Sequence, residues 1–94
     1  PMPPGTLFAQ WQESLADALT HIGEFSPQYL VVSLGVDAFE NDPIRFFKLT
    51  SADLLTTGQM IGSLAIPTLF VMEGGYDVDE IGVNVVNVLK GFEA

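Results

Sequence analysis

Two side chains with the chemistry of an active site, Asp37 and Tyr76, each follow a short apolar run that ends in glycine. A carboxylate can bind a divalent metal ion or act as a general base. A phenol can donate a hydrogen bond or a proton to a reacting oxygen. A purely structural role is also possible for each residue. Asp37 would then be a turn-forming aspartate, and the Tyr76 ring would pack over the strand ends. The two runs are Val32-Ser33-Leu34-Gly35-Val36-Asp37 and Val71-Met72-Glu73-Gly74-Gly75-Tyr76.

The apolar runs before Asp37 and Tyr76 predict two strands of a parallel sheet that is buried on both faces, because they are short, rich in β-branched residues and lack polar alternation. Ligands of open parallel sheets bind beyond the carboxyl ends of the strands, so we expect both side chains on one rim. Gly74 and Gly75 permit a tight turn and a close backbone approach to a ligand, and with Glu73 they are candidate substrate-binding residues. Their spacing is not that of a dinucleotide or phosphate-loop fingerprint, which argues against a nucleotide-binding half-domain.

The hydrophobic periodicity predicts an α/β chain of order α-β-α-β-α. A right-handed crossover would make its two strands parallel, although the sequence leaves open whether they are neighbours. Thr50 and Asp53 resemble a capping box, and a glycine directly after a helix is typical of a C-terminal cap. The predicted elements are a helix from Leu7 that ends at Gly23, a strand over Tyr29–Leu34, a helix from Ser51 to about Leu64, a strand over Thr68–Met72, and a helix from about Val78 to Lys90 that closes at Gly91.

The polar residues outside the two motifs have less specific interpretations. His21 is expected in the last turn of the first helix as an ordinary helical histidine, since no second metal ligand lies at helical spacing. The opening Pro1–Thr6 is expected to be irregular. Residues 35–49 form a loop long enough to be functional, in which Asp42-Pro43 indicates an ordinary turn. Acidic residues near the rim would suit a cationic substrate, although solvated loop charges are equally expected; they are Glu40, Asp42, Glu73 and Asp77.

The overall composition excludes several classes of function. Twelve acidic residues against three basic ones give a net charge of −9, which argues against nucleic acid or an anionic membrane as a partner. The absence of cysteine excludes disulfides and thiolate metal sites and favours the cytoplasm. No apolar segment approaches the roughly 20 residues that span a bilayer, and no signal peptide is visible. With 94 residues that begin at Pro1, and a marginal two-stranded sheet, we expect a piece of a larger protein.

The segment Ser33–Phe39 with Asp42-Pro43, followed by Val71–Tyr76, resembles the C-terminal part of the histone deacetylase and acetylpolyamine amidohydrolase superfamily. The segments Phe46–Thr50 and Glu80–Gly91 are most similar to the bacterial acetylpolyamine amidohydrolases. This resemblance covers nearly the whole chain. It implies a three-layer, mainly parallel arginase/deacetylase-like fold, in which residues 1–94 are the C-terminal part of a single domain. It also implies a zinc-dependent deacetylase that acts on acetylated polyamines or related small cationic acetyl-amines.

Within the resemblance, Asp37 corresponds to a zinc ligand, and Tyr76 to the tyrosine that stabilises the oxyanion formed when water attacks the acetamide. The Asp-x-His pair and the tandem histidines of the family are missing, and His21 cannot replace them because it precedes the first strand. We therefore expect an incomplete Zn²⁺ ligand set and no activity from this chain alone. The parent protein is expected to be a homo-oligomer. The alternative is a truncated homologue or a non-catalytic α/β module that associates through an exposed sheet edge.

Overall fold

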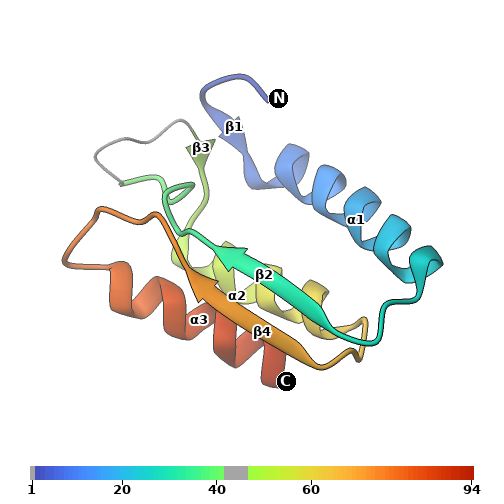
Figure 1. Ribbon diagram of the computed structural model, residues 1–94. Helices are drawn as coiled ribbons and strands as arrows, with labels where there is room; N and C mark the ends of the chain where they lie inside the picture. The colour runs from blue at the N-terminus through green and yellow to red at the C-terminus, as the bar shows by residue number, and fades with distance from the viewer. Residues whose placement is uncertain (1, 42–46) are drawn as a thin grey trace.

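The computed structural model describes residues 2–41 and 47–94. The elements follow the order β1-α1-β2-β3-α2-β4-α3 (Figure 1), so the predicted α-β-α-β-α order is confirmed and two short strands are added to it. The predicted turn at Asp42-Pro43 lies outside the described residues. The bounds are Thr6–Leu7 for β1, Phe8–Phe25 for α1, Leu30–Leu34 for β2, Phe47–Lys48 for β3, Ser51–Gly62 for α2, Thr68–Met72 for β4 and Ile81–Glu93 for α3.

Strands β2 and β4 are parallel neighbours, paired from Leu30 opposite Thr68 to Leu34 opposite Met72. Backbone pairing continues beyond both strands. The Glu73 N–H donates to the Leu34 carbonyl oxygen at 2.8 Å, and the Val36 N–H donates to the Gly74 carbonyl oxygen at 2.9 Å. These bonds hold the segments that follow β2 and β4 side by side at the carboxyl ends of the strands, where the sequence placed its candidate residues.

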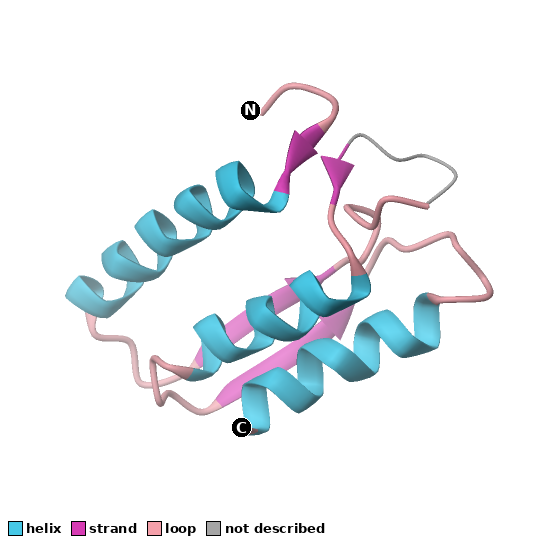
Figure 2. Ribbon diagram, turned by 180° about the vertical axis from the view of Figure 1, so that it is seen from behind, coloured by secondary structure: helices cyan, strands magenta, loops and turns pink. Residues whose placement is uncertain are grey.

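The prediction that both faces of the sheet are buried is wrong for the described residues. Figure 2 shows α2 and α3 on one face of the β2–β4 sheet. On that face Leu34 is buried and Val32 and Phe70 are partly buried. On the other face, Val31 is 64% exposed and Leu69 is 61% exposed, beside the exposed Val71. Both faces of the strands are apolar in sequence. Whether a face is buried depends on which elements pack against it, and α2 and α3 pack against one face only.

The core lies between the sheet and the two helices and consists of Leu34, Val36, Leu49, Leu54 and Val88. Phe8 and Trp11 of α1 pack against its edge. On β4, Phe70 meets Phe92 of α3 in an edge-to-face contact with ring centroids 5.2 Å apart. Burial of such large apolar side chains is the main stabilising term of a small α/β unit. The two apolar segments that lead to the site are therefore anchored in the core.

Helices α2 and α3 make a close backbone contact through glycines. A Cβ added to Gly58 would lie 1.9 Å from the Val88 carbonyl oxygen, and one added to Gly91 would lie 2.0 Å from the Leu55 carbonyl oxygen. The prediction that Gly91 closes the last helix is therefore wrong. Gly91 is buried inside α3, which continues to Glu93, because the missing side chain allows α2 to approach.

Helix α1 also ends later than predicted. It runs through Gly23 to Phe25, and Ser26 adopts the left-handed conformation with φ 56°, directly before Pro27. The Ser26 N–H donates to the carbonyl oxygens of Ile22 and Gly23 at 3.1 Å each. The stop is thus the serine before proline, because proline cannot continue the helical hydrogen bonds. None of the described helices combines the length and the apolar character that a membrane crossing requires.

Strand β1 consists of Thr6, the last residue of the segment expected to be irregular, and Leu7, the expected first residue of the helix, so both expectations are wrong at these positions. It pairs in parallel with β3 through Thr6 opposite Phe47 and Leu7 opposite Lys48. A further bridge joins Phe39 to Leu49. The predicted loop 35–49 is thus tied down at its described ends. The capping box at the start of α2 is confirmed, since the Asp53 N–H donates to Thr50 Oγ1 at 3.1 Å and the Thr50 N–H donates to Asp53 Oδ2 at 2.8 Å.

Candidate functional site

Asp37 lies in a tight turn directly after β2. The Phe39 N–H donates to the Val36 carbonyl oxygen at 3.2 Å, which closes the turn around Asp37 and Ala38. Val36 and Phe39 on either side are 2% and 4% exposed, whereas Asp37 is exposed. The chain therefore buries the flanking side chains and presents the carboxylate at the rim. Asp37 is part of a turn and is also presented at the sheet end, so the turn interpretation and the site interpretation are compatible.

The Asp37 carboxylate contacts the segment that follows β4. A Cβ added to Gly74 would lie 2.8 Å from Asp37 Oδ2 and 3.0 Å from its Cγ, so the carboxylate lies directly against the Gly74 backbone. Gly75 has a φ of +137°, and a Cβ there would lie 2.6 Å from Val36 Cγ2. Both glycines therefore permit close packing between the two strand ends. The residues singled out as one rim, Asp37 and the motif that carries Tyr76, are brought together.

Tyr76 and Glu73 are exposed at this rim, Tyr76 by 50%. Directly after Tyr76, Asp77 organises the entry into α3. Its Oδ1 accepts hydrogen bonds from the N–H groups of Asp79 and Glu80, at 3.1 Å and 3.2 Å. The Ile81 N–H donates to the Asp77 carbonyl oxygen at 2.8 Å. Asp77 was expected among the acidic residues for a cationic substrate, but its carboxylate also accepts hydrogen bonds in the turn that leads into α3.

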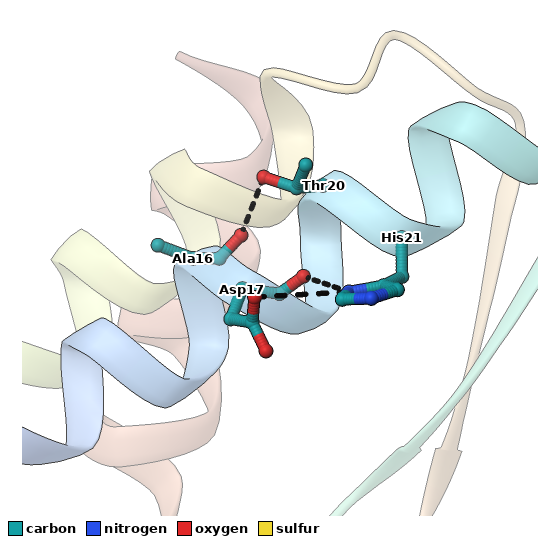
Figure 3. Close-up of polar contacts among 4 residues, drawn as sticks. All are labelled: Ala16, Asp17, Thr20 and His21. Carbon is teal, nitrogen blue, oxygen red and sulfur yellow. Dashed lines mark hydrogen bonds and ion pairs between the residues drawn. The ribbon is translucent and has the colours of Figure 1, made fainter.

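His21 does not reach the rim. It lies on the exposed surface of α1, one turn before the end of the helix, so its expected place in the last turn is wrong because the helix continues to Phe25. Figure 3 shows its ring against its own helix, where Nδ1–H donates to the Asp17 carbonyl oxygen at 2.8 Å. Asp17 Oδ1 lies 3.8 Å from the same nitrogen. His21 is thus an ordinary helical histidine, as expected.

A zinc ion normally takes three protein ligands at a catalytic site. Residues 2–41 and 47–94 contain no group of three histidine, cysteine, aspartate or glutamate side chains that could hold a metal ion. Asp37 has the right donor chemistry, an exposed carboxylate held in a fixed turn, but it supplies one ligand. The described residues therefore fit part of a zinc site and do not complete it.

A polar cluster that was not singled out from the sequence lies between α2 and α3. Asn84 is 1% exposed, and its Oδ1 accepts a hydrogen bond from Ser51 Oγ at 2.6 Å. Asn87 Nδ2 donates to the Ser51 carbonyl oxygen at 2.8 Å. These bonds join the first turn of α2 to the first two turns of α3. Two asparagines three residues apart on an otherwise apolar helix were the available signal, because buried amides require polar partners.

The chain is similar to known proteins over nearly its whole length. Residues 1–92 match the family model described as the histone deacetylase domain. The chain is 57% identical over 91 residues to an acetylpolyamine amidohydrolase of Mycoplana ramosa, covering 97% of this chain and 27% of that protein. It is 52% identical over 93 residues to acetylpolyamine amidohydrolase 2 of Pseudomonas aeruginosa, covering 99% of this chain and 27% of the relative.

Solved structures give the same result. The crystal structure of an acetylpolyamine aminohydrolase from Burkholderia pseudomallei superimposes with a TM-score of 0.96 at 37% identity, covering 100% of this chain and 28% of the other. The HDA15 HD domain superimposes with a TM-score of 0.84 at 27% identity, covering 95% of this chain and 26% of the other. The arrangement of helices and parallel strands is thus that of a deacetylase-like α/β fold. The chain spans about 27% of the length of these two curated relatives.

Proposed function

Because the chain belongs to the histone deacetylase domain family, we propose that it supplies one part of the active site of a zinc-dependent amidohydrolase that deacetylates acetylated polyamines or related acetyl-amines. One observation carries the proposal. The Asp37 carboxylate and the Gly74-Gly75-Tyr76 segment come from neighbouring parallel strands and meet at their carboxyl ends. This chain alone is expected to be inactive, since its ligand set is incomplete.

In the proposed reaction, water adds to the acetamide carbonyl, the C–N bond breaks, and acetate and the free amine leave. Tyr76 donates a hydrogen bond from its hydroxyl to the carbonyl oxygen, and this bond strengthens as negative charge develops there. Asp37 contributes one carboxylate to the metal site. The chemistry that zinc supplies when bound is polarisation of the carbonyl and a lowered pKa of water. Gly74 and Gly75 form the wall beside the reacting group.

The proposed substrate is a small acetylated amine that carries positive charge. The net charge of −9 favours the approach of cations. Near the rim, Glu73 is exposed, Glu40 is half-buried, and Asp42 lies outside the described residues. The relatives in Mycoplana ramosa and Pseudomonas aeruginosa are named for acetylpolyamines, which supports the same class.

The experiment that tests the role of Tyr76 is turnover of an acetylated diamine by the full-length protein and its Tyr76→Phe variant. Loss of one oxyanion donor should lower kcat by about a hundredfold or more. Tyr29→Phe is the matched control, because Tyr29 is exposed immediately before β2, at the opposite end of the strand, and its loss should leave turnover unchanged. Equal turnover by wild type and Tyr76→Phe would exclude Tyr76 as the donor.

The metal requirement is tested separately. A chelator should abolish the activity of the full-length protein, and added Zn²⁺ should restore it. Metal analysis of the 94-residue chain should find no stoichiometric zinc. If this chain alone bound one zinc ion tightly, the inference that its ligand set is incomplete would be wrong.

A second candidate function, a non-catalytic interaction module, is favoured by the exposed apolar sheet face of Val31, Leu69 and Val71. On this hypothesis the full-length protein self-associates or binds a partner through the sheet and has no deacetylase activity. If the wild-type protein deacetylates any acetylated amine and the Tyr76→Phe variant does not, the enzyme hypothesis is supported and the non-catalytic module is excluded.

A further inference from the structure

The Asp37 carboxylate lies across two glycines that come from different strands. A Cβ added to Gly74, after β4, would lie 2.8 Å from Asp37 Oδ2 and 3.3 Å from Oδ1. A Cβ added to Gly35, after β2, would lie 3.1 Å from Asp37 Oδ1 and 3.2 Å from the Gly74 nitrogen. A methyl group at position 74 would therefore require the Asp37 carboxylate to shift, and one at position 35 would require the carboxylate or the Gly74 backbone to yield by a few tenths of an ångström.

Backbone conformation does not explain why glycine occupies these two positions. The described glycines with positive φ are Gly5 and Gly75, so Gly35 and Gly74 have backbones that other residues adopt readily. Their difference from alanine is the space that a methyl group would fill. At Gly74 the Asp37 carboxylate occupies that space, which indicates that glycine is required at this position to accommodate the carboxylate.

The backbone of both glycines is also fixed. Val36 N–H donates to the Gly74 carbonyl oxygen, and Glu73 N–H donates to the Leu34 carbonyl oxygen, so hydrogen bonds between the strands flank each glycine. The Val36 side chain is buried in the core and anchors the segment that follows β2. A methyl group at position 74 would meet a rigid backbone on one side and a side chain with two rotatable bonds on the other. The carboxylate would move.

We propose that Gly35 and Gly74 are positioning residues that together fix the orientation of the Asp37 carboxylate. The consequence for zinc affinity rests on the proposed function, in which Asp37 is one of the metal ligands. Because they lack Cβ atoms, the two glycines leave space for the carboxylate in the orientation seen here, so that it does not have to be rearranged when the metal binds. Gly74 should contribute more to this positioning than Gly35, because a Cβ at Gly74 would lie closer to the carboxylate.

The test is a double-mutant cycle in the full-length protein with Gly74→Ala and Asp37→Ala, measured by chemical unfolding of the metal-free form and by zinc affinity from chelator competition. Gly74→Ala should lower the unfolding midpoint when Asp37 is present and should not lower it in the Asp37→Ala background, where the space is free. Its zinc affinity should fall about tenfold or more. Gly35→Ala should give a smaller effect in the same direction.

Gly82→Ala is the matched control, since a Cβ at exposed Gly82 meets nothing within 4 Å. It should leave zinc affinity unchanged. If Gly74→Ala lowers the unfolding midpoint equally with and without the Asp37 side chain, or lowers neither the midpoint nor zinc affinity, the positioning role is refuted. If the wild-type protein binds no zinc but the midpoint still shows the coupling, the positioning role stands and the proposed zinc-dependent function fails.

Discussion

Replacement of Gly58 by alanine should destabilise the protein, although alanine is the better helix former. A Cβ at Gly58 would lie 1.9 Å from the Val88 carbonyl oxygen, about 1.5 Å short of the 3.4 Å at which ordinary contact begins, and 2.9 Å from the Phe92 nitrogen. Both obstacles are backbone atoms of α3, so no rotamer change relieves them. Overpacking of this kind costs about 3 kcal/mol, and helix propensity returns at most about 1 kcal/mol. The expected net loss in free energy of unfolding is about 2 kcal/mol.

Chemical unfolding followed by far-UV circular dichroism measures this loss in the full-length protein. Gly82→Ala is again the control, since it gains the same helix propensity within α3 and meets no neighbour. The two variants should differ by about 3 kcal/mol, with Gly58→Ala the less stable. Equal stabilities would refute the close contact of α2 and α3, because propensity alone would then account for both.

Two further predictions concern side chains that accept backbone hydrogen bonds before a helix. Thr50→Ala removes the acceptor of the Asp53 N–H and should lower the free energy of unfolding by about 1 kcal/mol, while Thr50→Ser keeps the hydroxyl and should cost less; a larger loss with serine in the same unfolding assay would contradict the cap. Asp77→Ala should cost a similar ~1 kcal/mol by removing the acceptor in the turn before α3, whereas Asp77→Asn should retain it. A raised KM for an acetylated diamine with Asp77→Asn, at unchanged stability, would instead assign the charge of Asp77 to substrate binding.

The parts of the fold that depend on local sequence could be predicted. The strand over Thr68–Met72 has the predicted bounds, and α2 begins at Ser51 behind its capping box, because both signals lie within a few neighbouring residues. The pairing of Thr6–Leu7 with Phe47–Lys48 could not be predicted, since two-residue strands some forty positions apart leave no periodic signal.

Gly91 illustrates how one residue type supports two interpretations. A glycine near the end of an amphipathic helix is typical of a cap, and a glycine within a helix also permits close approach of another backbone. The sequence around Gly91 does not distinguish them, because the deciding fact is the position of Leu55 on α2. The exposed sheet face could not be predicted for the same reason. Burial of Val31 and Leu69 depends on which elements pack over them, and the local hydrophobic pattern does not reveal this.

At the site, the general rule for parallel sheets was sufficient to place Asp37 and the Gly74-Gly75-Tyr76 segment on one rim. The contact of the Asp37 carboxylate with Gly74 required the register of β2 and β4, because it depends on which residues lie opposite each other. The hydrogen bonds that Asp77 accepts could not be predicted, because the same carboxylate can bind a cationic ligand or accept from the backbone of a turn.

The contact between α2 and α3 has a mechanical consequence. Ser51 bonds to Asn84 at the first turns of the two helices, and Gly62 lies against Phe92 at their last turns, so the pair is held along its whole length. Because the contacts lie at both ends, α2 and α3 resist sliding against each other, and the pair behaves as one rigid body. The segment 73–80, which carries Tyr76, therefore enters a fixed helix pair at its C-terminal end, and within it Gly75 has a φ of +137°, which favours glycine.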